Sequence, residues 1–200
     1  MSEFAAFVQL GFAHITALDA IDHILFLLAL AAIYTPRDWP DILWVVTAFT
    51  VGHSLTLALA VTGMVRVDSA IVEFLIPLTI VATCIENMIV RARASPSRIR
   101  NRPILAGVFG LVHGAGFAGY LQNAFGENVG LPLAGFNLGI EAGQIVVLLA
   151  VFGFLHLLDG VIARSRAISS RWPVVRLRSA GVSVLIMIVA VRWAVLRSPW

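Results

Sequence analysis

Histidines and carboxylates stand inside strongly apolar stretches of this sequence. His53 interrupts "FTVGHSLTLALA", His113 interrupts "FGLVHGAGFAGY", and the pair Asp22 and His23 opens the run "DHILFLLAL". Imidazole nitrogens and carboxylate oxygens are donors that suit Zn²⁺, Ni²⁺, Co²⁺ and Cu²⁺ in proteins. These residue types therefore indicate a metal site built from histidine and acid side chains, provided that the fold brings them together.

The surroundings of these residues follow from composition. Of the 200 residues, 60% are hydrophobic and 12% are charged, and the mean hydropathy is +0.93. Soluble domains carry about 25% charged residues, so this composition excludes a soluble fold and indicates an integral membrane protein. The single cysteine, Cys84, excludes a cysteine-rich metal site and an intramolecular disulfide.

Six stretches of the sequence are long and apolar enough to cross a membrane, which takes about 20 residues in a helix. They cover roughly 12–34, 42–63, 71–91, 103–124, 132–157 and 175–197. Clusters of proline, charged and turn residues separate them, as in "YTPRDWPD" and "RARASPSRIRNRP". The expected fold is a single all-α transmembrane domain over residues 1–200, a polytopic protein with six spans.

The basic residues are all arginine, and they gather on one side of the predicted spans. That side holds Arg37, Arg91, Arg93, Arg98, Arg100, Arg102, Arg164, Arg166, Arg171, Arg176 and Arg178. The other side holds Arg66 and Arg197, and Arg192 can extend its side chain to that interface. Cytoplasmic loops carry the arginine surplus, so we expect a bacterial-type inner (cytoplasmic) membrane protein with both termini extracytoplasmic. The net charge of +3 then reports topology rather than nucleic-acid binding.

The depth of the polar residues singles out a metal-binding set. Each ionisable group in hydrocarbon costs about 3 kcal/mol on insertion scales, so such groups face a cavity or a partner. His23 is the midpoint of its predicted span, and His53 and His113 stand at the midpoints of theirs. Three histidines on three helices are thus predicted at one level near the bilayer centre. With the acids at similar depth, the predicted ligands are His23, His53, His113, Asp22 and Glu141.

Other polar residues in the spans are interpreted as pathway residues or as groups that orient the ligands. They are His14, Asp19, Ser54, Glu86, Asn87, Asn137 and Gln144. On a continuous helix His14 points away from Asp22 and His23, which places it near the outer mouth. Glu73, beside the outer loop, is interpreted as a solvated or helix N-terminal charge rather than a ligand, and a vestibule role is left open.

Glycines mark the faces that are expected to pack closely. In the fifth span, a stripe of Gly135, Gly139 and Gly143 lies opposite the polar stripe that contains Asn137, Glu141 and Gln144. Small residues allow a neighbouring helix to approach within backbone contact. The glycines of 103–124 predict either the same close packing or a locally broken helix, which is tolerated at membrane depth only where it lines a cavity.

Five segments of the chain, in order, resemble the HupE/UreJ family of small membrane proteins. They are "GFAHITALDAIDHILFLLAL", "TAFTVGHSLTLALA", "VEFLIPLTIVATCIEN", "FGLVHGAGFA" and "GFNLGIEAGQ", between residues 11 and 144. The resemblance implies nickel or cobalt uptake, of the kind that supplies hydrogenase and urease. Position by position it points to His14, Asp22, His23, His53, Ser54, Glu86, Asn87, His113, Asn137, Glu141 and Gln144. Two departures, the long spacing from His14 to His23 and the lack of a leader-like basic segment before the first span, point to a divergent subgroup.

The residues leave three functions open. The first is a permease for a divalent transition metal, with nickel or cobalt as cargo, in contact with the lipid bilayer and with no nucleic-acid partner. The second is an intramembrane zinc-dependent hydrolase, in which three histidines hold Zn²⁺, Asp22 or Glu141 acts as general base and Ser54 stabilises an oxyanion. The third is a metal-sensing or insertion partner of a larger complex. A second copy of the chain is a further candidate partner.

Overall fold

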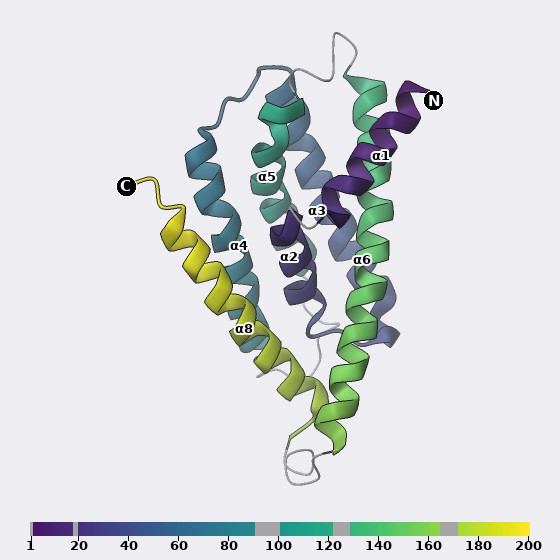
Figure 1. Ribbon diagram of the computed structural model, residues 1–200, viewed down its shortest axis with the longest axis vertical. Coiled ribbons are helices and arrows are strands. Elements are labelled where there is room, and N and C mark those ends of the chain that lie inside the picture. The colour runs from purple at the N-terminus through teal and green to yellow at the C-terminus, as the bar shows by residue number, and fades with distance from the viewer. Residues whose placement is uncertain (1, 18–19, 91–100, 122–128, 165–171) are drawn as a thin grey trace.

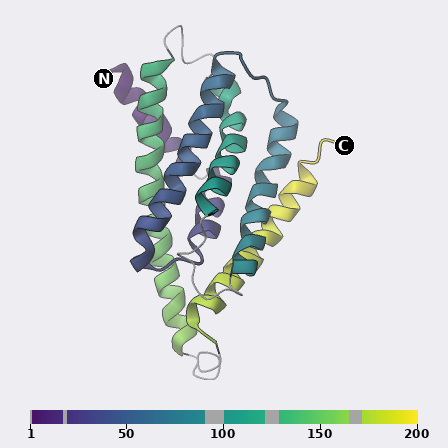
Figure 2. The same ribbon diagram turned by 180° about the vertical axis from the view of Figure 1, so that it is seen from behind.

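The computed structural model describes residues 2–17, 20–90, 101–121, 129–164 and 172–200, and within these residues it contains helices and no strand. The elements are α1 (Glu3–Thr16), α2 (Ile21–Ala31), the short 3₁₀ helix η2 (Pro36–Asp38), α3 (Trp39–Val61), α4 (Ser69–Val90), α5 (Arg102–Leu121), α6 (Gly130–Arg164) and α8 (Val174–Leu196). Figures 1 and 2 show an elongated bundle in which α3 lies against α5, α1 against α6, and α4 against α8. The all-α class expected from the sequence is confirmed.

The first predicted span is not a single helix over 12–34. The chain forms α1 from Glu3 to Thr16 and α2 from Ile21 to Ala31, and the two axes are bent by 67°. Figure 1 shows α1 descending to the middle of the bundle and α2 continuing toward the lower end. Asp19, a predicted pathway residue, lies outside the described residues. The break therefore falls at the depth where the sequence places its first acid and histidine side chains.

The other five stretches correspond to helices with similar bounds. α6 departs most, because it continues to Arg164 beyond the expected end at residue 157. In the described part of the chain, four helices are long and apolar enough to cross a membrane: Pro36–Val61, Ser69–Ile89, Gly130–Arg164 and Val174–Leu196. α1 and α2 make a fifth if they are counted as one bent span. The structure thus has the elements of a multi-pass membrane protein.

Glycines bring two helix pairs into backbone contact. A Cβ atom at Gly139 of α6 would overlap the carbonyl oxygen of Val8 in α1, so the glycine stripe of α6 does face a close neighbour. A Cβ atom at Gly114 of α5 would likewise overlap the carbonyl oxygen of His53 in α3. Because α5 is continuous over Arg102–Leu121, its glycines serve packing rather than a break in that helix. These contacts fix the histidine-bearing segments of α1, α3 and α5 within the bundle.

Arg178 holds the carboxyl end of α2. This side chain is 2% exposed, and its guanidinium donates to the carbonyl oxygens of Ala32 (3.1 Å from Nη2) and Tyr34 (2.5 Å). Nη1 also donates to Asp159 Oδ2 of α6 at 2.6 Å. A cation at the carboxyl end of a helix interacts favourably with the helix dipole. Arg178, which the sequence assigns to the membrane interface, is therefore a buried link between α2, α6 and α8.

Candidate metal centre

Three histidines from three helices meet beside the break between α1 and α2. In the described part of the chain, His14, His23 and His53 each offer a ring nitrogen, and these atoms all lie within 4.8 Å of one another. The ring centroids are 4.8 Å apart for His14 and His23, 5.8 Å for His14 and His53, and 6.2 Å for His23 and His53. A shift of less than about 1 Å per side chain would bring three imidazoles to the Zn–N or Ni–N distance of about 2.0–2.1 Å.

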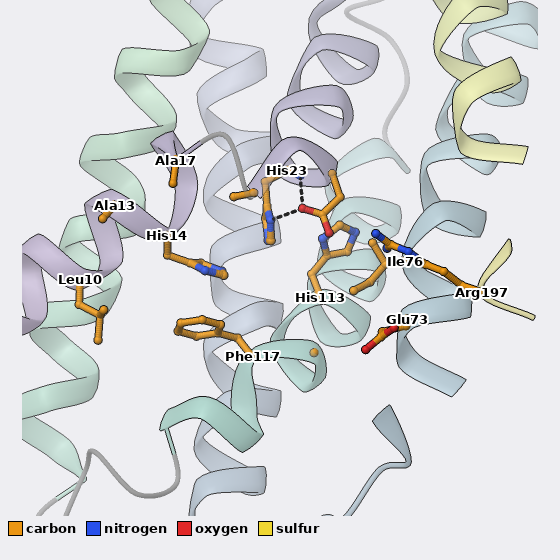
Figure 3. Close-up of a pocket in the computed structure, with 13 residues that line it drawn as sticks. Leu10, Ala13, His14, Ala17, His23, Glu73, Ile76, His113, Phe117 and Arg197 are labelled. Carbon is orange, nitrogen blue, oxygen red and sulfur yellow. Dashed lines mark hydrogen bonds and ion pairs between the residues drawn. The ribbon is translucent and has the colours of Figure 1, made fainter. Parts of the chain in front are cut away.

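His14 occupies a different place from the one expected. A continuous helix over 12–34 would direct its side chain away from His23, toward the outer mouth. The break ends α1 two residues after His14, so that its ring lies 4.8 Å from that of His23. Figure 3 shows the two rings facing each other across the break. The orientation predicted for His14 was wrong because it assumed one uninterrupted helix.

Asp22 fixes the orientation of His23. The carboxylate oxygen Oδ1 accepts hydrogen bonds from the backbone N–H of His23 at 2.8 Å and from its ring Nδ1 at 3.0 Å. Because a carboxylate accepts this bond, the ring proton sits on Nδ1 and the lone pair on Nε2. Carboxylates orient metal-binding histidines in the same way in many sites and raise their basicity. Nε2 of His23 is therefore the nitrogen available to a ligand.

Four of the five other ring nitrogens of this group are buried and have no hydrogen-bond partner among the described residues. They are Nε2 of His14, Nε2 of His23 and both ring nitrogens of His53. His53 is 0% exposed. Buried polar atoms are almost always paired, because an unpaired one loses its hydration with no compensation. A bound cation would supply the missing partner to several of these atoms at once.

His113 lies next to this group but outside it. Its ring is 5.0 Å from that of His23, the side chain is 1% exposed, and its Nε2 lies 3.0 Å from Thr79 Oγ1 of α4. The other nitrogen, Nδ1, has no hydrogen-bond partner within the described ranges. The rings of His14, His53 and His113 thus lie around that of His23.

Aromatic side chains enclose the histidines. Phe117 packs on His14 with ring centroids 4.0 Å apart, Phe49 lies 5.1 Å from His113, and Phe136 lies 6.4 Å from His53. Apolar walls lower the local dielectric constant and strengthen electrostatic interactions inside the site. The arrangement suits a dehydrated or partly dehydrated ion.

A cavity of about 590 Å³ leads from the surface to the histidines. Its polar lining residues are His14, Asp22, His23, Glu73, His113 and Arg197. Figure 3 shows the histidines on one side, with Glu73 and Arg197 on the other. Glu73 is exposed, so the cavity reaches the surface near the amino end of α4. Glu73 thus shares a cavity with the histidines, which agrees with the vestibule position left open by the sequence.

Several predicted residues lie away from the histidines and serve other contacts. Glu86 Oε2 accepts from Nε of Arg102 at 3.1 Å, and Asn87 Oδ1 accepts from Nη2 of the same residue at 2.7 Å. Ser54 donates to the carbonyl oxygen of Thr50 at 2.7 Å. Glu141 is half-buried on α6 and, as far as the described residues go, belongs neither to the group of three nor to the cavity lining.

The polar stripe of α6 contacts α3 at Thr50, on the helix that carries His53. Gln144 Oε1 accepts from Thr50 Oγ1 at 2.9 Å, which leaves Gln144 Nε2 buried and unpartnered within the described chain. Asn137 Oδ1 is also buried and unpartnered there. Thr79, which contacts His113, is a residue that sequence analysis did not assign to the site. Thr79 stands four residues before Thr83 on the same face of α4, and this spacing was the signal in the sequence that pointed to Thr79.

Comparison with known proteins identifies the family of this chain. A family model described as "HupE / UreJ protein" matches residues 1–197, essentially the whole chain. Comparisons with curated proteins and with solved structures each found no match. The matched region includes the bent pair α1–α2 and every histidine of the centre. The chain belongs to the HupE/UreJ family.

Proposed function

We propose that this protein is a membrane permease for a divalent transition metal, with nickel or cobalt as its cargo. One observation carries the proposal: the unpartnered ring nitrogens of His14, His23 and His53 lie within 4.8 Å of one another inside an apolar bundle. Imidazole suits nickel, cobalt and zinc, and the group contains no thiolate that would favour a softer ion. The family association with nickel and cobalt uptake supports the same cargo.

The broken first span supports transport. Transporters often build their substrate sites from discontinuous helices near the middle of the membrane. Here α1 ends and α2 begins at the histidines, and the cavity of about 590 Å³ gives an ion a route from the surface near Glu73. The ion would exchange water for imidazole nitrogens at the end of that route. Because a transport site must also release its ion, we expect moderate rather than very tight binding.

We propose the six-span topology with both termini extracytoplasmic. α5 begins, α6 ends and α8 begins at the lower end of the bundle in Figure 1, and these ends carry Arg102, Arg164 and Arg176. An arginine surplus marks the cytoplasmic side. The cavity near Glu73 would then open to the extracytoplasmic side of an inner membrane.

Two buried arginines link the helices at the opposite end of the bundle. Arg178 binds the carboxyl end of α2, and Arg102 pairs with Glu86. Positive charges on this route oppose the passage of a cation, so release to the cytoplasm requires these links to move. Such a change corresponds to alternating access, in which one side closes while the other opens.

The membrane potential can drive this transport. The sequence contains no lysine and so no nucleotide-binding loop of the G-x-x-x-x-G-K-[ST] type. One elementary charge crossing 100 mV gains about 2.3 kcal/mol, so a divalent cation gains about twice that. An inside-negative potential therefore suffices for accumulation without ATP hydrolysis.

Two contacts favour transport over hydrolysis. The hydroxyl of Ser54 donates its proton to the Thr50 carbonyl, so it does not point a donor at an oxyanion in the histidine group. Glu141 lies outside the cavity lining among the described residues, which removes one candidate general base. The histidine and aspartate set remains, and it is sufficient for binding an ion.

Radioactive nickel uptake into proteoliposomes tests the proposal. We expect saturable uptake by the wild type, faster with an inside-negative potential. His53→Ala removes a metal ligand and should lose about 90% of this uptake. The matched control is His156→Ala, because His156 is exposed on α6 and lies outside the cavity lining. A wild type that binds nickel but carries none across the membrane would overturn the permease proposal.

A further inference from the structure

His113 is held by one residue of a neighbouring helix. Its ring nitrogen Nε2 lies 3.0 Å from the hydroxyl oxygen of Thr79, and both side chains are buried. The same hydroxyl lies 2.7 Å from the backbone carbonyl oxygen of Ile76. Thr79 therefore stands between a histidine ring and a carbonyl group of its own helix.

The position of the hydroxyl proton follows from these partners. A carbonyl oxygen can only accept a hydrogen bond, so Thr79 must donate its single proton to Ile76. The hydroxyl oxygen can then only accept from His113, which places the ring proton of His113 on Nε2. Nδ1 consequently carries the lone pair, and it is buried with no hydrogen-bond partner in the described part of the chain.

We propose that Thr79 is a positioning residue that fixes the tautomer and orientation of His113, so that Nδ1 of His113 serves as the fourth imidazole donor to the transported metal. This inference rests on the proposed metal permease. His23 lies between the two sides of the centre, with its ring 4.8 Å from that of His14 and 5.0 Å from that of His113. The ring of His113 therefore lies beside the ring of His23, which an ion in the group of three would contact.

The two central histidines are set in opposite tautomers. Asp22 accepts from Nδ1 of His23 and leaves Nε2 as its donor atom, whereas Thr79 accepts from Nε2 of His113 and leaves Nδ1. Partners of this kind fix which nitrogen binds a metal. Removing one lowers the metal affinity about 10–100-fold. A carboxylate and a hydroxyl thus perform the same task on two neighbouring rings.

Thr83 provides a matched control. It lies one turn further along α4, is equally buried, and donates its hydroxyl proton to the carbonyl oxygen of Thr79 at 2.9 Å. Thr83→Val and Thr79→Val each remove one hydroxyl group from α4. Of the two hydroxyls, the one on Thr79 hydrogen-bonds to His113. Thr79→Ser retains the hydroxyl and should therefore restore the behaviour of the wild type.

Two measurements test the proposal. The first is ¹⁵N NMR of the metal-free protein, with the His113 signals assigned by comparison with His113→Ala. We expect the Nε2–H tautomer in the wild type, Thr79→Ser and Thr83→Val, and a mixture of tautomers in Thr79→Val. The second is equilibrium titration with Co²⁺, in which Thr79→Val should bind about 10–100-fold more weakly, while Thr79→Ser and Thr83→Val stay within about threefold of the wild type.

The outcomes separate this inference from the proposed function. A wild type with the ring proton of His113 on Nδ1, or equal Co²⁺ affinities for Thr79→Val and Thr83→Val, would overturn the inference and leave the metal permease standing. A wild type that binds neither Co²⁺ nor Ni²⁺ would overturn both. A tautomer change together with the selective loss of Co²⁺ affinity in Thr79→Val would support both.

Discussion

Asp22 Oδ1 lies 3.0 Å from His23 Nδ1 and joins the first turn of α2 to the metal centre. The two residues are neighbours in sequence, and Asp22 also accepts from the backbone N–H of His23. The carboxylate can orient the ring in this way because α2 begins at Ile21, immediately after the break. The break therefore gives His23 both its place among the other histidines and its tautomer.

Neutralising Asp22 should weaken metal binding without unfolding the protein. Asp22→Asn keeps an oxygen that can accept from His23 Nδ1 but removes the negative charge near the ion. We expect nickel affinity, measured by calorimetric titration, to fall about 10–100-fold. Asp41→Asn is the control, because Asp41 is exposed in the first turn of α3. Equal affinities for the two variants would contradict the role assigned to Asp22.

The contact between α1 and α6 should tolerate no side chain at Gly139. Gly139→Ala places a methyl group against the Val8 carbonyl, and overpacking of this kind costs about 1–3 kcal/mol. Gly153 is on the same helix, and no described atom lies within 4 Å of a Cβ built there. Gly153→Ala should therefore raise the free energy of unfolding by about 0.5–1 kcal/mol, as glycine replacement in a helix does. Thermal unfolding in detergent would compare the stabilities of the two variants. A Gly139→Ala variant as stable as the wild type would contradict the close packing of α1 and α6.

Removing Arg178 should destabilise the whole bundle. Arg178→Ala leaves Asp159 without its 2.6 Å partner and frees the carbonyl oxygens of Ala32 and Tyr34. Loss of one member of a buried ion pair costs about 3–5 kcal/mol. Arg176→Ala, two residues earlier and exposed, should change the free energy of unfolding by less than about 0.5 kcal/mol. Similar unfolding curves for the two variants would show that the Arg178 contacts contribute little.

The proposed sidedness can be read by cysteine labelling in intact cells. Cys84 is buried, so the wild type should react little with a membrane-impermeant maleimide. Ser2→Cys, at the exposed amino end of α1, should be labelled in intact cells. Ala163→Cys, at the arginine-rich end of α6, should be labelled only after the membrane is opened. The reverse labelling pattern would show that the termini face the cytoplasm and would contradict the proposed topology.

The sequence predicts much of this architecture because its signals are strong. Apolar runs bounded by charged residues and prolines give five of the helices with nearly correct bounds, and the glycine stripe of α6 predicts a close neighbour. Depth in the predicted spans selects His23, His53 and His113, and the structure places the rings of His53 and His113 within 6.2 Å of that of His23. These inferences rest on hydropathy and on helical periodicity, both of which are local properties.

The remaining features depend on tertiary structure. The run from His14 to His23 contains neither proline nor glycine, so nothing local shows that the helix breaks there. A helical wheel that treats residues 12–34 as one helix therefore gives the wrong direction for the His14 side chain. Arg178 and Arg102 look like interfacial arginines from their positions in sequence, and only their pairing with Asp159 and Glu86 shows that they are buried.

X-ray absorption spectroscopy of the nickel-loaded protein tests the central claim most directly, because it reports the ligands of the ion itself. We predict one nickel ion per chain, a first shell of nitrogen and oxygen without sulfur, and outer-shell scattering from at least three imidazoles. His53→Ala should lose one imidazole, and His156→Ala should retain them all. A nickel spectrum without imidazole scattering, or the same spectrum in wild type and His53→Ala, would contradict the claim that His14, His23 and His53 hold the metal.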